Sequence, residues 1–207
     1  MNDEEYKTGS IKYVEGDITN YPEADYICQQ NDCVSHHSYS LSYTIAVKLG
    51  VDPYEQRCIT SGIGIKSLDP DFTMPDLGTI QFFPATKKDK NVTVICMYAQ
   101  KGWGSIESNS TSRLETFQSR EKAFQECLNQ INEEVERTAV IAFPYAIGCG
   151  HGGGSWLNYQ TMITDFAQKN RRTVRIVAQP SDEEAEELIK RKAEKNKKRR
   201  YSRQSVY

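Results

Sequence analysis

The sequence predicts an α/β fold in which a mostly parallel β-sheet is covered by helices on both faces. Over the second half of the chain, short apolar segments alternate with segments of helical periodicity. The 207 residues, 38% of them hydrophobic and 26% charged, suffice for one domain with a sizeable core. No apolar run reaches the roughly 18 residues that a membrane span needs.

Six segments rich in β-branched and aromatic residues are predicted to be strands. They span residues 10–19, 24–32, 77–84, 91–100, 138–146 and 172–179. The first ends at Gly16-Asp17, and the second leaves polar residues at its carboxyl end. A lysine-rich turn separates the third from the fourth.

Three segments carry apolar residues at helical spacing and are predicted to be helices. They span residues 40–50, 112–135 and 155–170. The apolar stripe of the first is Leu41, Ile45 and Leu49, and Gly50 suits the position after its last turn. The stripe of the second is predicted to be Phe117, Ala123 or Phe124, Cys127 or Leu128, Ile131 and Val135. That of the third is Trp156, Tyr159, Met162 or Ile163, and Phe166.

The chain is predicted to divide into an N-terminal extension (1–9), one domain (10–179) and a charged tail (180–207). Ser181 and Glu184 match a capping box, which predicts that the tail begins as an exposed helix. Nine bases and one acid lie between Lys190 and Arg203. We expect this basic end either to bind an acidic or nucleic-acid partner or to remain solvated.

The cysteines and the opening residues favour an intracellular protein, cytoplasmic or nuclear, without membrane contact. The six cysteines form no C-x-x-C pair, and several lie in apolar runs where cysteine packs as a small hydrophobe. The first ten residues are polar and acidic, unlike a signal peptide. Three histidines, two of them adjacent, do not make a ligand set. We therefore expect no metal and no cofactor.

Five glycines fall within residues 148–154, between a predicted strand and a predicted helix. Exposed main-chain N–H groups in such a turn can bind an anion, most often a phosphate. The alternative is a plain tight connection between strand and helix, but that would need only one or two glycines. Gly148-x-Gly150-x-x-Gly153 also matches the dinucleotide fingerprint. A NAD-dependent oxidoreductase therefore stays open as a weaker alternative, although the loop comes late in the chain for that fold.

The carboxyl ends of other strands supply candidates for the same crevice, where ligands of parallel sheets bind. Asp17 is expected either to accept a hydrogen bond from an exocyclic amine, such as that of adenine, or to cap a turn. Asn31 and Asp32 end the second strand, and Gln100 and Lys101 end the fourth.

Taken together, these motifs resemble the macro domain family, in particular a branch similar to ADP-ribose-1″-phosphate phosphatase-like proteins. The resemblance spans about residues 10 to 179, and its motifs occur in the family's order. They are Gly16-Asp17-Ile18-Thr19, Asn31-Asp32-Cys33-Val34, Ser40-Leu41-Ser42, Asp52-Pro53-Tyr54-Glu55-Gln56-Arg57, Leu77-Gly78-Thr79-Ile80, Tyr98-Ala99-Gln100 and the glycine loop.

The resemblance implies a three-layer α/β/α fold with a mixed, mostly parallel sheet that binds ADP-ribose. Asp17 would hold the adenine amine beside the Ile18 backbone. Asn31 and the segment through Leu41 and Ser42 would form a wall near the distal ribose. The diphosphate and distal ribose would be cradled by Ile147, Gly148, Cys149, Gly150, His151, Gly152 and Gly153.

The chain departs from that branch at several positions. Ser38-Tyr39-Ser40 replaces Pro-His-Gly in the first ligand loop, which adds a side chain where a glycine is expected. Gly152 and Ser155 stand where related proteins carry acids. We expect Cys149 to pack rather than to act as a nucleophile, since a catalytic thiolate needs a depressed pKa.

Two main hypotheses for the function follow. In the first, the protein hydrolyses an ADP-ribose derivative, either ADP-ribose 1″-phosphate or an ADP-ribosyl linkage, with Asn31 and His151 as the catalytic residues that position water. A histidine turned outward is the alternative for His151. In the second, the protein is a reader that binds ADP-ribose or its polymers without turnover.

Overall fold

The computed structural model describes residues 9–60, 66–87, 91–106 and 115–179. The predicted N-terminal extension lies almost entirely outside the described residues, and the predicted tail, 180–207, lies wholly outside them.

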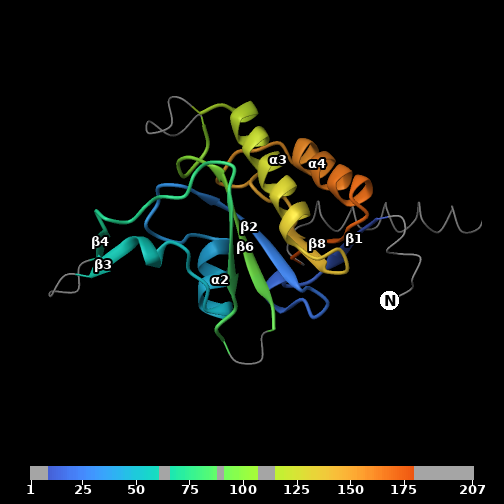
Figure 1. The fold of residues 1–207 in the computed structure, drawn as a ribbon, viewed down its shortest axis with the longest axis horizontal. Helices are drawn as coiled ribbons and strands as arrows, with labels where there is room; N and C mark the ends of the chain where they lie inside the picture. The colour runs from blue at the N-terminus through green and yellow to red at the C-terminus, as the bar shows by residue number, and fades with distance from the viewer. Residues whose placement is uncertain (1–8, 61–65, 88–90, 107–114, 180–207) are drawn as a thin grey trace, which may run out of the picture.

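A six-stranded sheet with the order β1-β8-β7-β2-β6-β5 forms the middle of the domain (Figure 1). The strands are β1 (Ser10–Glu15), β2 (Tyr26–Asp32), β5 (Ile80–Pro84), β6 (Thr93–Gln100), β7 (Val140–Pro144) and β8 (Thr173–Ala178). All pairings are parallel except that of β5 with β6, which is antiparallel. The predicted mixed, mostly parallel sheet is therefore confirmed.

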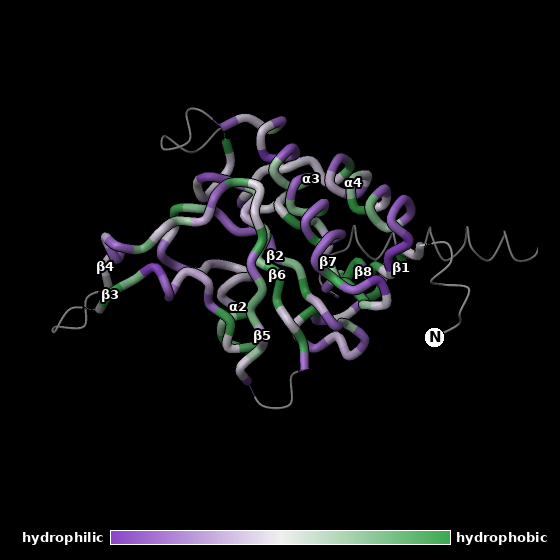
Figure 2. Tube along the Cα trace, in the orientation of Figure 1, coloured by the Kyte–Doolittle hydropathy of each residue, from purple (hydrophilic) through white to green (hydrophobic). Residues whose placement is uncertain are grey.

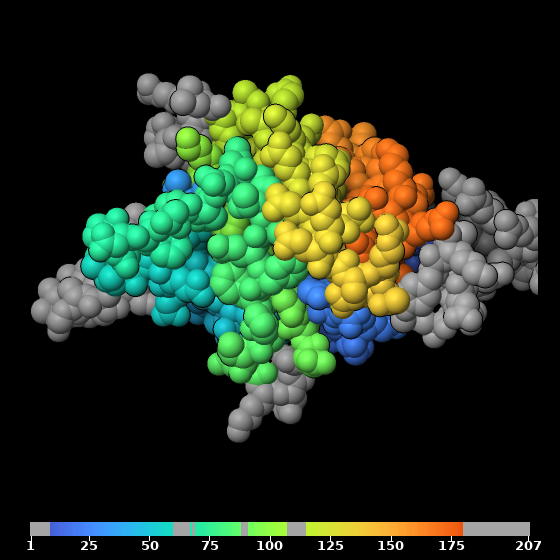
Figure 3. All heavy atoms as spheres, viewed as in Figure 1, coloured from blue at the N-terminus to red at the C-terminus, as the bar shows by residue number. Residues whose placement is uncertain are grey.

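Helices cover both faces of this sheet. α3 (Phe117–Glu134) and α4 (Trp156–Lys169) lie side by side on one face, and α2 (Leu41–Leu49) lies on the other (Figure 1). The core accordingly divides into two clusters, one containing Phe124, Ile131 and Ile163 and the other Ile45 and Leu49. Figure 2 shows the apolar residues concentrated along the strands and on the inner sides of the helices. Figure 3 shows α3 and α4 as part of the outer surface.

The beginning of α3 differs from the prediction. The helix begins after Thr116, whose hydroxyl accepts from the Ser119 amide while the Ser119 hydroxyl accepts from the Thr116 amide, a reciprocal cap. The predicted stripe is also wrong at its first position, because Phe117 is 39% exposed while Arg120 is 1% exposed. The first turn lies beyond the apolar core, and Arg120 turns inward to bond two loops.

Four short elements were not predicted. Strands β3 (Cys58–Thr60) and β4 (Lys66–Leu68) form a separate antiparallel ribbon, preceded by a 3₁₀ turn, η2 (Glu55–Arg57). A second 3₁₀ turn, η1 (Ile18–Asn20), follows β1. Runs of three residues are too short for a periodic apolar pattern, so the sequence carries no strong signal for them.

All six cysteines are unpaired thiols, and four of them are buried, as expected of small core residues. Among the described residues, no cluster of three or more His, Cys, Asp or Glu side chains is arranged to hold a metal ion. No described helix combines the length and apolar character that crossing a bilayer requires.

Candidate functional site

A pocket of about 320 Å³ opens where the carboxyl ends of β1, β7 and β8 meet the first turn of α2. Parallel strands place their carboxyl ends along one edge of the sheet, which is why segments far apart in the sequence converge there. The pocket is lined by Ile18, Ser40, Leu41, Thr44, Pro144, Tyr145, Val177 and Gln179. Two predicted ligand-binding residues, Ile18 and Leu41, are among them.

Asp17, predicted to grip a base, precedes Ile18 and caps η1. Its Oδ1 accepts from the Thr19 amide at 2.9 Å and from the Thr19 hydroxyl at 2.6 Å, and its Oδ2 accepts from Lys48 Nζ at 2.5 Å. Partial burial alone would raise the pKa of Asp17, but the hydrogen bonds from Lys48 and Thr19 outweigh it and lower that pKa. The carboxylate is therefore held ionised in a fixed orientation. Both predicted roles, a turn cap and a hydrogen-bond acceptor, are compatible with this geometry.

The glycine loop follows β7, and four of its five glycines are required by neighbouring protein atoms. A Cβ on Gly148 would lie 2.4 Å from Gln30 Oε1, and one on Gly152 would lie 2.4 Å from the Gly148 carbonyl oxygen. A Cβ on Gly153 would approach Ser105, and one on Gly154 would approach the Tyr159 ring. Close packing within the protein thus accounts for most of the glycine content.

Gly150 is different, because a Cβ there would meet nothing within 4 Å. Gly150 and His151 are both exposed at the tip of the loop. The N–H groups of Cys149 and Gly153 donate to carbonyls within the loop, at 2.9 and 3.0 Å. No acceptor for the N–H groups of Gly150, His151 and Gly152 is found within the described residues. Gly152 is buried, so the part of the predicted cradle that is open to an anion is its exposed tip, residues 150–151.

Two glutamines form the floor beneath this loop. Gln30 Nε2 donates to Gln100 Oε1 at 2.9 Å, and Gln100 Nε2 donates to the Gly102 carbonyl at 3.0 Å. Gln30 belongs to β2 and Gln100 to β6, so the pair joins neighbouring strands directly under Gly148 and Gly152. The sequence pattern marks both positions only as polar strand ends.

Asn31, predicted as catalytic, lies next to Gln30 on the strand, and successive side chains of a strand face opposite ways. Its Nδ2 donates to the Tyr54 hydroxyl at 3.0 Å, and it is 1% exposed. Its Oδ1 has no hydrogen-bond partner among the described residues. Gln30 therefore contacts the glycine loop, while Asn31 belongs to the network around Tyr54.

Arg120 joins the glycine loop to the loop after β6. Its Nη1 donates to the carbonyls of Gly104 and Gly152 at 2.8 and 2.7 Å, and its Nη2 donates to Glu115 Oε2 at 2.8 Å. Glu115 Oε1 in turn accepts from the Lys101 amide at 2.6 Å. Both side chains of this ion pair are almost completely buried. A buried charged pair with this many hydrogen bonds fixes three segments relative to one another.

Arg57 has the same function in the loop after β2. It is fully buried, and its two terminal nitrogens donate to the carbonyls of Ser35 and Asp32 at 2.7 and 3.0 Å. Its guanidinium also lies 4.7 Å from the centre of the Tyr54 ring, a cation–π contact. Burial, followed by the charge of Asp32, raises the pKa of Tyr54, so its hydroxyl stays protonated. The sequence marked Arg57 only as the end of a motif and did not single out Arg120.

The first ligand loop keeps a glycine-type backbone although it lacks the glycine. Ser40 has φ 52° and ψ −122°, a conformation almost restricted to glycine, and it lines the pocket. Ser42, a predicted ligand residue, uses its hydroxyl within the loop. The hydroxyl accepts from the Tyr39 amide and donates to the Tyr39 carbonyl oxygen. Tyr39 is 63% exposed, so it does not fill the pocket. His36 and His37 are exposed, and their ring centres lie 4.2 Å apart.

Of three further predicted loop residues, two are packed into the protein and one is exposed. Burial raises the pKa of the Cys149 thiol to about 12, and its sulfur lies 3.2 Å from the Ile147 carbonyl. This agrees with a packing role, because almost no thiolate exists near neutral pH. Ile147 is itself buried against the core. His151, by contrast, is exposed.

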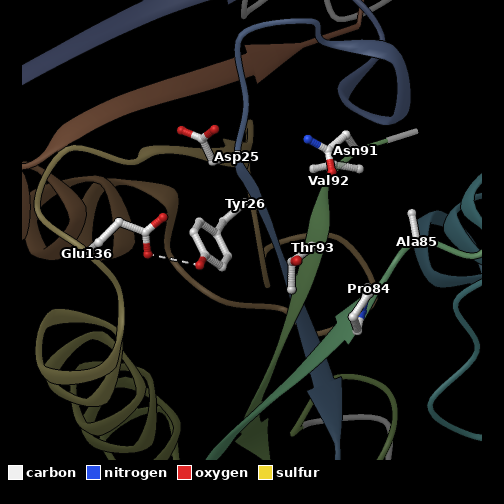
Figure 4. A pocket seen from close by; sticks show the side chains of 8 residues that line it. All are labelled: Asp25, Tyr26, Pro84, Ala85, Asn91, Val92, Thr93 and Glu136. Carbon is white, nitrogen blue, oxygen red and sulfur yellow. Dashed lines mark hydrogen bonds between the residues drawn. The ribbon is translucent and has the colours of Figure 1, made fainter. Parts of the chain in front are cut away.

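A second pocket, of about 220 Å³, lies at the opposite end of the strands (Figure 4). It begins at Tyr26 and Thr93, the first residues of β2 and β6. Its two carboxylates already serve the fold: Glu136 accepts from the Tyr26 hydroxyl at 3.0 Å, and Asp25 accepts from the Val140 amide at 2.8 Å. This pocket is remote from the glycine loop, so the candidate site is the first pocket.

The fold of this chain is found among known structures. No family model matches the sequence, and no curated protein matches it. Among solved structures, the macrodomain of Mycobacterium tuberculosis DarG is 17% identical, with 84% of this chain and 99% of that chain covered and a TM-score of 0.55. This chain has the macrodomain fold.

Two other solved macrodomains of this fold contain a nucleotide. A point mutant of the Oceanobacillus iheyensis macrodomain with ADPR is 17% identical, with 93% of this chain and 96% of that chain covered and a TM-score of 0.55. The Trypanosoma brucei macrodomain in complex with ADP is 11% identical, with coverage of 87% and 67% and the same TM-score. At such identities the likeness establishes the macrodomain fold of this chain, as the motifs predicted.

Proposed function

We propose that this protein binds ADP-ribose, with the adenine end in the pocket beside Asp17 and the diphosphate against the exposed loop tip, residues 150–151. The observation that carries the proposal is the exposed tip of the glycine loop, where main-chain N–H groups have no acceptor among the described residues. Amides of this kind, close to the N-terminus of α4, favour an anion.

Two further observations support the ligand's class. The pocket combines the apolar side chains of Ile18, Leu41 and Val177 with the Asp17 carboxylate close by, which suits a base with an exocyclic amine. Macrodomain structures of the same fold were solved with ADPR and with ADP. A diphosphate-linked adenine nucleotide satisfies the apolar pocket, the carboxylate and the amides together.

Calorimetry with ADP-ribose, adenosine, NAD and NADH tests this proposal. ADP-ribose is expected to bind and adenosine to bind much more weakly, because adenosine offers nothing to the loop amides. Equal affinities for the two would contradict the role given to the glycine loop. Absence of ADP-ribose binding would remove the proposal, and a preference for NADH would favour the oxidoreductase alternative.

Turnover is a second candidate function, favoured by His151. This side chain is exposed beside the loop amides, where it can reach a distal phosphate or a water molecule. In the proposed reaction, water attacks the phosphorus of ADP-ribose 1″-phosphate and the bond between phosphorus and the ribose oxygen breaks. The ribose oxygen takes up a proton from the attacking water, and ADP-ribose and inorganic phosphate are the products. Hydrolysis of an ADP-ribosyl linkage would use the same bound nucleotide.

Phosphate release from ADP-ribose 1″-phosphate separates a hydrolase from a reader. His151→Ala is the cleaner variant, because His151 is exposed, whereas Asn31→Ala also removes a buried partner of Tyr54. Release that is lost in His151→Ala, while ADP-ribose affinity is kept, supports catalysis. Binding without any release by the unmodified protein would leave only the reader function.

A further inference from the structure

Lys48 reaches from α2 to the carboxylate that the proposed function places beside the base. Its Nζ lies 2.5 Å from Asp17 Oδ2, although the two residues are 31 positions apart in the chain. Asp17 Oδ1 is already bonded to Thr19, so Oδ2 is the oxygen available to an outside donor. The two side chains remain 50% and 35% exposed, so solvent or a ligand has access to both.

The ion pair is adjacent to the pocket through neighbouring residues that line it, although neither Asp17 nor Lys48 is itself in the lining. Thr44 lines the pocket and lies four residues before Lys48, so both side chains are on the same face of α2. On the other side, Ile18 lines the pocket directly after Asp17. A base that rests between Ile18 and Thr44 therefore presents its edge to both the carboxylate and the ammonium.

The pair offers an acceptor and a donor side by side. A carboxylate oxygen has two lone pairs, so Asp17 Oδ2 can accept a second hydrogen bond while Lys48 is present. The ammonium has three N–H groups, of which one is directed at Asp17. Adenine shows the complementary pattern, an exocyclic N6 donor next to a ring-nitrogen acceptor.

We propose that Lys48 is a base-specificity residue, which donates a hydrogen bond to a ring nitrogen of adenine while Asp17 accepts from N6. This inference rests on the proposed ADP-ribose binding and extends it by a residue. In hypoxanthine O6 is an acceptor that would face the Asp17 carboxylate. Its N1 carries a hydrogen, so if Lys48 faces N1 the ammonium also opposes hypoxanthine, whereas at N7 the two bases offer Lys48 the same acceptor. Because the ion pair is exposed, opening it slightly to admit the base costs little.

A chemical double-mutant cycle tests the contact directly. ADP, 7-deaza-ADP, 1-deaza-ADP and IDP are titrated into the unmodified protein and into Lys48→Met. Loss of one hydrogen bond from a charged donor is expected to weaken ADP binding by roughly tenfold in Lys48→Met. One of the two deaza analogues, which lack the ring acceptor, is expected to lose a similar factor with the unmodified protein and almost nothing further with Lys48→Met.

Lys48→Arg and Lys169→Met are the matched comparisons. Lys48→Arg keeps a charged donor at this position and is expected to recover much of the ADP affinity. Lys169 also pairs with an aspartate, at 2.7 Å, but it lies at the far end of α4, so Lys169→Met should leave all four affinities unchanged. A melting curve for each variant confirms that the fold is retained.

The outcomes separate this inference from the proposed function. If the unmodified protein binds neither ADP nor ADP-ribose, the proposed function fails and the inference fails with it. If ADP binds but neither deaza analogue is coupled to Lys48→Met, or if Lys48→Met binds ADP as well as the unmodified protein does, the inference alone is overturned. Coupling to 1-deaza-ADP with a reduced preference for ADP over IDP in Lys48→Met supports it with N1 as the acceptor, and coupling to 7-deaza-ADP with that preference unchanged supports it with N7 as the acceptor.

Discussion

Arg120 donates a hydrogen bond of 2.7 Å to the carbonyl oxygen of Gly152, so a helix residue fixes the glycine loop from below. The same guanidinium is paired with the buried carboxylate of Glu115. The rigidity of the candidate site therefore depends on one ion pair that lies beneath the loop rather than at its exposed tip.

Arg120→Met is expected to destabilise the protein by about 3–5 kcal/mol, because it leaves Glu115 charged and buried without a partner. The free energy of unfolding is measured in urea. Lys169→Met, which breaks the exposed pair with Asp165, should cost less than about 1 kcal/mol. Adding Glu115→Gln to Arg120→Met should restore part of the loss, since the amide oxygen can still accept from Lys101. Equal losses in the two single variants would contradict this view of the pair.

Gly148 and Gly150 are expected to respond in opposite ways to alanine. Gly148 has φ 73°, and a Cβ there meets Gln30, so Gly148→Ala should cost about 2 kcal/mol or more. Gly150→Ala meets open space and should change stability by less than about 0.5 kcal/mol. Thermal melting compares the two. A Gly150→Ala protein as unstable as Gly148→Ala would mean that the loop tip is packed.

Ser40→Gly is expected to stabilise the protein by about 1 kcal/mol. The strain of a non-glycine residue at φ 52° and ψ −122° is relieved, and the greater freedom of glycine in the unfolded chain offsets only part of the gain. Ser155→Gly is the control, because Ser155 also precedes a helix without a side-chain cap bond but has an ordinary φ of −83°. A gain of the same size in both variants would assign the effect to something other than backbone strain.

Asp17→Asn should reduce stability near neutral pH and have less effect in acid. The folded-state pKa of Asp17 is lowered, so its ionised form contributes stability above the ordinary value of 3.8, and this contribution is lost as the pH falls through the lower folded value. Asparagine can still accept from Thr19, which keeps the turn cap. Unfolding in urea at neutral pH and at a pH below 3.8 measures the difference. A difference that grows in acid would contradict the sign.

Most of the fold follows from local patterns in the sequence. The six strands of the main sheet and the three helices were predicted in their order, since alternating or helical periodicity within one segment reports which residues face a core. The β3–β4 ribbon was missed because its strands have three residues each. The first turn of α3 differs from the prediction because Phe117 continues a helical stripe that the core does not reach.

The candidate site was predicted less completely. The glycine loop stands out because five glycines in seven residues exceed what a tight turn needs, and Asp17 because it ends a predicted strand at the edge where ligands of parallel sheets bind. The sequence does contain a signal for Arg120, which lies at helical spacing before Phe124, Cys127 and Ile131 and thus on the buried stripe. An arginine in such a position has to be paired, but its partner cannot be read from spacing alone.

The sequence by itself determined the order of the elements and the glycine-rich connection before α4, because those depend on neighbours along the chain. Tertiary structure alone decided that Gln30, rather than Asn31, lies under the loop and that Lys48 meets Asp17. Those contacts join residues brought together by strand order and by the docking of α2. If β2 were shifted by one residue, each of its side chains would face the opposite side of the sheet, and Asn31 rather than Gln30 would point at the loop. Packing across the whole sheet decides between the two arrangements.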